Sequence, residues 1–550
     1  MDAKWLWTAF LMALAMAVSA RAAPLPSCND ESVDDLTFLD DEDVASHRMF
    51  ELAPVVFADG DNASYQVSVH LIVNADGTVR CADMAEDDVD SLPPLAVHYP
   101  EPAVRAEVAK WRYEPYRDGG KPVPFSVDET LLATHAPLKP AAMPAATPAT
   151  TTLSLQRSHC LGDVCPAYKL TIHGDGRVEF DGLATDVTGH LAYEVAPSDV
   201  DALVADLRRQ NLWSVQDAYV SAATDSANIL LTLDLGGQHK TIRDYVGQDA
   251  GMPDTVTSAE AAMDSLAGVD RWIHVSQDSL SDLDALHFDY TGQAGANLLV
   301  NVIEDSDAED AVALALLDRH ASLAGKTSTY PDGDAPDETK WPVDAAFEGG
   351  RTALVGPLIG AGALLKEGKP EQVRINSAFR TAIEAGDLED AKKIGTFHPA
   401  VTYGVTYTDY DTDPSTDKTL AVPLLFDVQA GSDTALETVR YLVSLGADPK
   451  GKNEDGATTL EKLCDNAEIV KYLIGMGVDI NAKDNDGNTA LLEVDDEDAA
   501  VFLLDSGADA TVQNGFGDTI FSQADFHAWP KVQAWLKAHK VKKPEPAPEA

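Results

Sequence analysis

Cys160 and Cys165 have the residue type and spacing in this chain that are best suited to chemistry. They flank the segment Leu-Gly-Asp-Val, whose Gly162 allows the tight turn that would bring the two sulfur atoms together. In an oxidising compartment such a pair forms a disulfide, and we predict a Cys160–Cys165 disulfide. The adjacent His159 leaves two alternatives open, a zinc site and a thiol-based active site, although a single C-x4-C pair is a weak zinc signal.

The other three cysteines are isolated in the sequence. Cys28 and Cys81 could pair, but their spacing does not decide the question. Cys464 lies on an apolar helix face, where we expect a buried free thiol.

The acidic residues and histidines show no recognisable catalytic or metal-binding pattern. Asp409, Asp411 and Asp413 have the spacing of the first ligands of a calcium loop, but Pro414 and Leu420 replace the glycine and the glutamate that such a loop requires. The sequence has no G-x-S-x-G, H-E-x-x-H, Walker A or G-x-G-x-x-G motif, and its 14 histidines are scattered. We therefore expect no catalytic residue, no resident metal and no cofactor.

The chain is strongly acidic. Its 550 residues include 91 Asp and Glu against 40 Lys and Arg, which gives a formal net charge of −51. This charge disfavours nucleic acid, whose binding needs clustered Lys and Arg, and anionic membrane surfaces. Basic proteins, cations and neutral molecules remain as partner classes. The 45% content of hydrophobic residues supports several buried cores, and the length is typical of three or four domains.

The first 22 residues have the pattern of a cleavable secretory signal. Lys4 precedes an apolar run over residues 5–18, and Ala20 and Ala22 follow in an A-x-A arrangement. The run is shorter than the roughly 20 residues that span a bilayer, so cleavage is favoured over a retained anchor. Cys28 lies too far beyond the run for a lipoprotein signal. We expect a periplasmic or secreted protein of a Gram-negative bacterium, without a stable membrane anchor.

Composition divides the rest of the chain. Residues 23–45 are acidic and poor in large hydrophobic residues, so a solvated leader segment is expected. Residues 136–150 contain four prolines among Ala and Thr, which predicts a semi-rigid spacer. The remaining segments are folded regions at residues 46–135, 151–280 and 286–540, and a disordered tail at residues 541–550.

The region at residues 46–135 is predicted to be a small α+β domain. Residues 65–73 alternate like a strand with one apolar face, and Asp76 and Gly77 predict a hairpin turn into the next strand. A helix is expected over residues 102–110 and a last strand over residues 123–132. Trp111 and Tyr113 are expected as core aromatic residues between the helix and the last strand.

Three short motifs in this region occur in the order found in a known family. They are D-G-T-V at residues 76–79, W-R-Y-x-P at residues 111–115 and G-G-K-P-V at residues 119–123. Over about 70 residues this order resembles the TonB C-terminal domain. The resemblance implies a docking module, and in that family the module contacts outer-membrane receptors.

The region at residues 151–280 is also predicted to be α+β. Strands are expected over residues 152–156, 168–173 and 229–235, and a helix is expected to Leu207 with Ser198 as its N-cap. The run from Cys160 to Tyr168, followed by a strand and G-D-G, resembles a family of uncharacterised domains in bacterial exported proteins that often precede ankyrin repeats. The resemblance implies no particular activity.

The third region is periodic. Gly446, Gly477 and Gly507 end similar segments at spacings of 31 and 30 residues. Residues 469–491 are close to the ankyrin consensus, although the usual T-P-L-H becomes T-T-L-E, T-A-L-L and T-I-F-S in successive units. Each unit has an apolar stripe that only a neighbouring unit can bury. We expect six or seven degenerate units, three of them clear.

Together these patterns predict a multidomain protein with two small α+β domains followed by an all-α ankyrin-type solenoid. The predicted function is non-catalytic binding of a protein partner, basic proteins included, through the repeat hairpin tips. The alternatives are a TonB-like component that contacts outer-membrane receptors and an enzyme within residues 151–280. The candidate contact residues at the tips are Lys452, Asn453, Glu454, Asp484, Asn485, Gln513 and Asn514.

Overall fold

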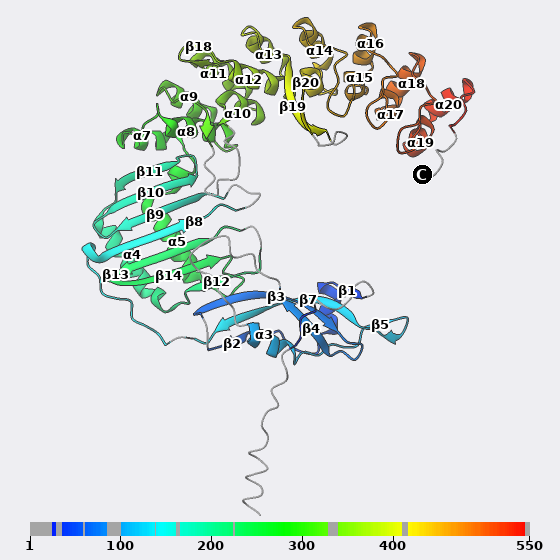
Figure 1. Ribbon diagram of the computed structural model, residues 1–550. Coiled ribbons are helices and arrows are strands. Elements are labelled where there is room, and N and C mark those ends of the chain that lie inside the picture. Colours follow the sequence, from blue (N-terminus) through cyan, green and yellow to red (C-terminus); the bar gives the residue numbers. More distant parts are fainter. Residues whose placement is uncertain are drawn as a thin grey trace, which may run out of the picture. The chain divides into compact units, whose positions relative to one another are not determined.

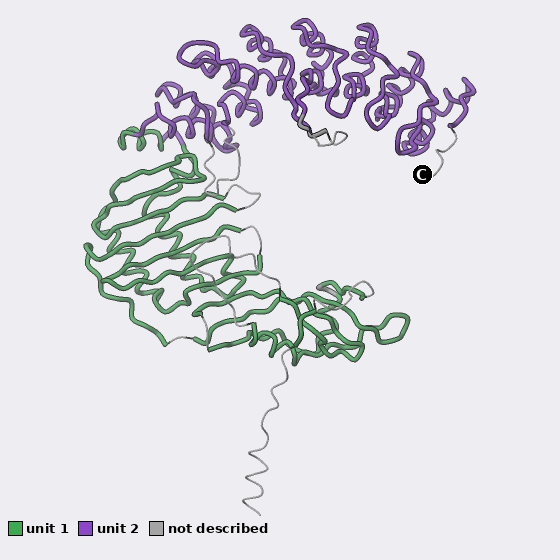
Figure 2. The backbone as a smooth tube through the Cα atoms, in the orientation of Figure 1, with its two compact units in different colours: residues 1–275, 279–287 green, residues 276–278, 288–550 purple. Residues whose placement is uncertain are grey.

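The computed structural model describes residues 25–28, 36–58, 61–84, 101–137, 139–160, 165–223, 226–327, 339–409 and 416–544. The predicted signal, part of the predicted leader, and Asp411 and Asp413 lie outside these residues. The chain forms two compact units (Figure 2): unit 1 has residues 1–275 and 279–287, and unit 2 has residues 276–278 and 288–550. Unit 1 is a mixed α/β region and unit 2 is predominantly helical (Figure 1).

Unit 1 is built on one 12-stranded sheet. The strand order is β1-β7-β3-β12-β14-β13-β8-β9-β10-β11, with β2 paired to β7 and β4 paired to β3. The strands are β1 (Thr37–Leu39), β2 (Val55–Phe57), β3 (Ala63–Val73), β4 (Val79–Met84), β7 (Phe125–His135), β8 (Thr151–Arg157), β9 (Ala167–His173), β10 (Arg177–Ala184), β11 (Gly189–Glu194), β12 (Ala218–Val220), β13 (Ile229–Leu235) and β14 (Gln238–Tyr245).

The helices of unit 1 cover the sheet. Helix α3 packs its Val104 and Val108 into the same core as Trp111 and Tyr113, which are buried as predicted. Figure 1 shows α4 and α5 along strands β8 to β14. The helices are α2 (Asp41–His47), α3 (Glu101–Val108), α4 (Pro197–Arg209), α5 (Asp254–Ala267) and α6 (Asp270–Ile273), with a short hairpin of β5 (Arg117–Asp118) and β6 (Lys121–Pro122) and 3-10 turns η2 (Pro148–Thr150) and η3 (Leu212–Ser214).

Strand β12 joins the two regions that the sequence analysis treats as separate domains. It pairs in parallel with β3 on one side and with β14 on the other. Ala218 and Val220 enter the core that contains α3, whereas the buried Tyr219 between them points to the opposite face. One three-residue strand therefore contributes to the packing on both faces of the shared sheet.

The described part of the segment over residues 136–150, predicted as a spacer, packs against the rest of unit 1. Met143 is 7% exposed. The Arg208 guanidinium donates to the Pro144 carbonyl at 2.9 Å, and the Ser214 hydroxyl accepts from the Ala141 amide at 2.9 Å. Proline favours an extended backbone here as expected, but burial and these hydrogen bonds fix the segment in place.

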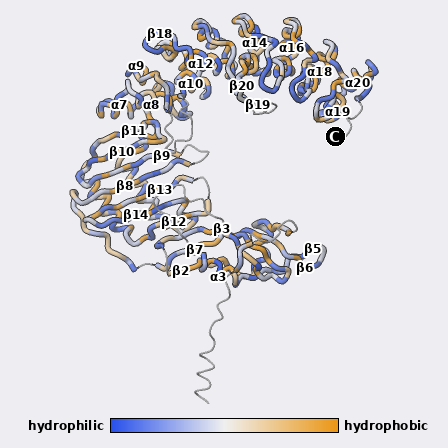
Figure 3. Tube along the Cα trace, in the orientation of Figure 1, coloured by the Kyte–Doolittle hydropathy of each residue, from blue (hydrophilic) through white to orange (hydrophobic). Residues whose placement is uncertain are grey.

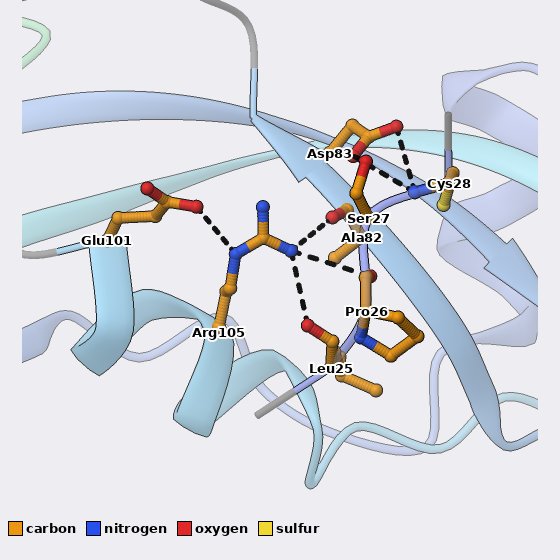
Figure 4. Close-up of polar contacts among 8 residues, drawn as sticks. All are labelled: Leu25, Pro26, Ser27, Cys28, Ala82, Asp83, Glu101 and Arg105. Atoms are coloured by element: carbon orange, nitrogen blue, oxygen red, sulfur yellow. Dashed lines mark hydrogen bonds and ion pairs between the residues drawn. The ribbon is translucent and has the colours of Figure 1, made fainter. Parts of the chain in front are cut away.

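Residues 25–28, the first that the structure describes, form a strap across β4 and α3 (Figure 4). Cys28 is disulfide-bonded to Cys81, which settles the pairing that the sequence left open. The Asp83 carboxylate accepts from the Cys28 amide at 3.0 Å, and Arg105 donates to the Ala82 carbonyl at 2.5 Å and to the Leu25 carbonyl at 3.4 Å. The strap is therefore fixed by covalent and polar contacts together.

Two local predictions in unit 1 are wrong. Residues 36–45, predicted as part of a solvated leader, supply β1 and the start of α2, because the fully buried Val44 gives this acidic segment an apolar anchor. Ser198 is not the N-cap of α4, since the helix begins at Pro197 and Ala196 occupies the cap position. Proline at the first helical position loses no hydrogen bond there, which explains the earlier start.

Unit 2 consists mainly of short helices joined by hairpins. Within the described residues, no helix has both the length and the apolar character needed to cross a bilayer. Its elements are helices α8 (Gln293–Glu304), α9 (Asp310–Asp318), α10 (Pro342–Glu348), α11 (Val355–Ala361), α12 (Gln372–Glu384), α13 (Leu388–Gly395), α14 (Ala435–Ser444), α15 (Thr459–Lys462), α16 (Ala467–Gly475), α17 (Ala490–Glu493), α18 (Glu497–Asp505), α19 (Ile520–Phe526) and α20 (Pro530–Ala538), hairpins β15 (Lys326–Thr327) with β16 (Thr339–Lys340), β17 (Leu365–Lys366) with β18 (Lys369–Pro370) and β19 (Thr402–Asp409) with β20 (Thr416–Pro423), and 3-10 turns η4 (Thr352–Leu354) and η5 (Leu424–Asp427); helix α7 (Gln277–Ala285) contains the boundary between the units.

The helices of unit 2 pack in two rows. Helices α14, α16, α18 and α20 contact one another in succession, and so do the shorter α15, α17 and α19. Apolar positions recur along these helices (Figure 3), and in α16 they place Ile469, Val470 and Leu473 fully inside. Gly477, which follows the C-cap residue of α16, takes φ +80°, the left-handed conformation that glycine adopts at helix ends. Cys464 is a buried free thiol, as predicted.

Candidate functional site

Three hairpin turns precede the short helices of unit 2, and we call them finger 1 (residues 452–458), finger 2 (residues 483–489) and finger 3 (residues 513–519). In fingers 1 and 3 the first and last residues form a β-bridge: Lys452 pairs with Thr458, and Gln513 pairs with Thr519. Each turn contains a glycine with positive φ, such as Gly487 at +83°. The fingers are therefore short, tightly closed loops.

Some of the predicted contact residues hold the fingers in shape. The Asn453 side chain accepts from the Ala457 amide at 2.9 Å, and Asp484 accepts from the Asn488 amide at 2.7 Å. Asn514 has the same role in finger 3, where its oxygen accepts from the Asp518 amide at 2.7 Å. These side chains act mainly as turn-forming groups.

Other predicted residues link one finger to the next. The Asn485 amide donates to the Asp455 carbonyl at 2.8 Å, and its side chain donates to the Glu454 carbonyl at 3.2 Å. The Gly515 amide donates to the Asp486 carbonyl at 2.6 Å. The hydrogen bonds make the three fingers one continuous ledge, and we use this name for fingers 1 to 3 below.

Lys452 and Gln513 also make polar contacts within the ledge. The Lys452 ammonium donates to the Lys483 carbonyl at 3.1 Å, and the Gln513 side chain donates to the Gly517 carbonyl at 3.0 Å. Glu454 is exposed. The structure thus brings all seven predicted residues to the ledge, but it leaves few of their polar groups free of internal contacts.

Phe516 is the prominent ledge residue that the sequence analysis missed. It occupies the place in finger 3 that Asp455 and Asp486 occupy in fingers 1 and 2, directly before the turn glycine. Its side chain is 75% exposed. An aromatic residue at a position that is acidic in the two preceding units is the signal that could have identified it.

A longer hairpin, β19–β20, lies one unit before the ledge. Its base is held by Arg380 of α12, whose guanidinium lies 3.9 Å from the centre of the Tyr403 ring. The same group forms ion pairs with Asp427 at 3.0 Å and Glu384 at 2.9 Å. Tyr403 is within electrostatic reach of Glu454 in finger 1. The anchored base therefore adjoins the ledge.

The short helices beside the ledge carry carboxylates with raised pKa values. Burial, together with the charges of Asp484 and Glu493, raises the pKa of Glu461 to about 7. Burial and the charges of Asp484, Asp495 and Asp486 likewise raise the pKa of Glu493. Burial is the first cause of both shifts, and the mutual repulsion of the neighbouring carboxylates adds to it.

A network of polar side chains lies inside unit 1, where α5 meets β8 and β9. Arg157 donates to Asp264 at 2.9 Å and to the Tyr168 hydroxyl at 2.9 Å, and Tyr168 donates to Asp264 at 2.7 Å. Glu260, one turn before Asp264, is 2% exposed, and its Oε1 has no hydrogen-bond partner. Burial and then the charge of Asp244 raise the pKa of Glu260 to about 8.

Cys160 and Cys165 form the predicted disulfide. In this state neither sulfur is a thiolate, so neither can act as a nucleophile or bind zinc. The adjacent His159 is exposed. In the parts of the chain that the structure describes, no group of three or more His, Cys, Asp and Glu residues could hold a metal ion.

Two models of known families match parts of the chain. Residues 151–267 match a domain of unknown function (DUF6438), and residues 428–521 match ankyrin repeats (3 copies). A search of curated proteins gives no match to the chain. The ankyrin match confirms the predicted repeat family and includes the ledge. Neither model covers residues 46–135, so the similarity to the TonB C-terminal domain stays a prediction.

Proposed function

We propose that this protein is a non-catalytic, extracytoplasmic binding protein that holds a protein partner on the ledge of its ankyrin repeats. Ankyrin repeats indicate a role in protein–protein interaction. The observation that carries the proposal is the ledge itself, three hydrogen-bonded fingers with the exposed Phe516 at one end. A fixed surface loses little conformational entropy when it binds.

Phe516 is the proposed apolar anchor of this interface. Aromatic residues contribute disproportionately to binding energy because they bury a large area with few rotatable bonds. The carboxylates around finger 2 supply the polar part, and they favour a partner of opposite charge. The long hairpin β19–β20 would extend the contact beyond the ledge.

Site-specific photo-crosslinking tests the proposal directly. We would place benzoylphenylalanine at Phe516 in the full chain and, as control, at Met476, which is 41% exposed at the end of α16. The expected result is one reproducible protein adduct from Phe516 in the extracytoplasmic fraction of the source organism, and none from Met476. Equal crosslinking from both positions would show that the ledge is not the binding surface.

The extracytoplasmic location is supported by two observations. Residues 1–22 have the pattern of a secretory signal, and the disulfides Cys28–Cys81 and Cys160–Cys165 are typical of oxidising compartments. N-terminal sequencing of the mature protein tests the location. We expect the mature protein to begin at about Ala23, directly after the predicted signal. A cytosolic protein that still begins at Met1 would refute the location.

A further inference from the structure

Five carboxylates surround finger 2 and the adjoining helices α15 and α17. We call them the acidic cluster: Glu461, Asp484, Asp486, Glu493 and Asp495. Asp484 is within electrostatic reach of Glu461 and Glu493, and Asp486 and Asp495 act on Glu493. Across the described residues, none of the five carboxylates takes part in an ion pair. The cluster thus concentrates negative charge without a bound counter-charge.

Glu461 is the buried member of the acidic cluster, and one of its carboxylate oxygens is unsatisfied. Its side chain is buried, with 6% of the residue exposed. Oε2 accepts from the Thr458 amide at 2.7 Å, but Oε1 is buried without any hydrogen-bond partner. A buried acceptor without a partner costs roughly 1–3 kcal/mol. Lys452 acts on Glu461 only from a distance, because its ammonium donates to the Lys483 carbonyl.

We infer that the acidic cluster receives a Lys or Arg side chain of the protein partner; this inference rests on the proposed function and names the chemistry of its partner. Glu493, Asp486 and Asp495 are exposed and can accept hydrogen bonds from an ammonium or guanidinium group. The cation then offsets the mutual repulsion of the carboxylates and the charge of Glu461. Helix α17 and finger 2 hold Glu493 and Asp486 in place before the partner arrives, and the Asp495 amide donates to the Asp465 carboxylate at 2.7 Å.

The geometry favours an organic cation over a metal ion. A divalent ion needs several oxygen ligands converging at about 2.0–2.6 Å. No such convergence of His, Cys, Asp or Glu exists among the residues that the structure describes. A Lys or Arg side chain carries its charge on a long flexible stem, so it can interact with carboxylates that are spread over two helices and a turn.

Fluorescence anisotropy with the full chain tests this inference. The probe is a labelled tetraarginine peptide, with tetraglutamate as the charge-reversed peptide and CaCl2 as the competing metal. The test variant is E461Q/E493Q, since Gln keeps the shape of Glu and can still accept from the Thr458 amide. The matched control is E437Q/E468Q, which removes the same number of carboxyl groups from exposed positions on α14 and α16. Melting curves establish that both variants are folded.

We expect E461Q/E493Q to bind tetraarginine about tenfold more weakly than the unmodified chain, and E437Q/E468Q to change the affinity less than about twofold. If both variants weaken tetraarginine binding equally, the binding is due to the net charge of the chain, and the inference is overturned. A CaCl2-binding signal that the test variant abolishes would also overturn it. The crosslinking assay separates the two claims. If benzoylphenylalanine at Phe516 captures the partner as well in E461Q/E493Q as in the otherwise unmodified chain, only this inference fails. If the positions of Phe516 and Met476 crosslink alike, the proposed function fails.

Discussion

Replacing Glu260 by Gln should make unit 1 more stable at neutral and alkaline pH. Glu260 lies on α5 and is 2% exposed, and its Oε1 has no hydrogen-bond partner. The nearest cation is Arg157, at 3.8 Å, and Arg157 is already engaged by Asp264 and by the Tyr168 hydroxyl. Burial therefore outweighs the attraction of Arg157, and the pKa of Glu260 rises to about 8.

The sign of the effect follows from proton linkage. Glu260 holds its proton in the folded state up to about pH 8, whereas in the unfolded state it loses the proton near its ordinary pKa of 4.5. Stability therefore falls as pH rises between these two values. At about 1.36 kcal/mol per pH unit, the free energy of unfolding falls by roughly 3 kcal/mol up to pH 7, and this penalty approaches roughly 5 kcal/mol above pH 8. E260Q is neutral in both states and lacks this penalty.

Native-state hydrogen exchange of the full chain would measure the effect. Peptides from α5, β8 and β9 report the opening free energy of this part of unit 1, and each variant is followed at pH 5, 6, 7 and 8. The difference between E260Q and the unmodified chain should grow with pH. E194Q, at an exposed position of β11, should show no such trend. A difference for E260Q that is the same at pH 5 and pH 8 would refute the assignment of a raised pKa to Glu260.

Three further predictions concern the strap and the ledge. C28S/C81S should lower the free energy of unfolding by about 4 kcal/mol, because the disulfide closes a loop with a sequence separation of 53 residues; a chemical denaturation curve checks this. F516A should change the free energy of unfolding by less than about 0.5 kcal/mol, since the ring is 75% exposed, and should still weaken partner binding in the crosslinking assay. G487A should cost about 1 kcal/mol for its φ of +83°, and G456A more, since its added Cβ would lie 2.6 Å from the Asn485 side-chain oxygen; melting temperatures compare the two.

The local patterns of the fold could be predicted from the sequence. Strand β13 is predicted over residues 229–235 and has these bounds, and a turn at Gly236 and Gly237 follows it. Alternation and turn glycines are local signals, and they specify hairpins well. Strand β12 was missed because three residues carry no periodicity. Its pairing with both β3 and β14 depends on segments far away in the sequence.

The N-caps of the short helices in unit 2 differ from one repeat to the next. Thr458 and Thr519 cap α15 and α19 through their side chains, whereas Thr489 at the same position of α17 makes no side-chain cap. In α15 the third helical residue is Glu461, which completes a capping box with Thr458. The corresponding residue in α17 is Leu492, which cannot return that hydrogen bond. The repeat pattern alone does not distinguish these cases.

The same residue types that make a finger visible in the sequence limit its use for binding. Asn and Asp are favoured in tight turns because their side chains bond to nearby backbone amides, and Asn453, Asp484 and Asn514 are used in this way. The Phe516 side chain takes no part in these hydrogen bonds, although its amide donates to the Asn514 side chain at 3.0 Å. Glu461 replaces the usual histidine of the repeat with a carboxylate, of which only Oε2 is used, for capping α15. Departures from the repeat consensus are therefore better candidates for binding residues than the consensus positions are.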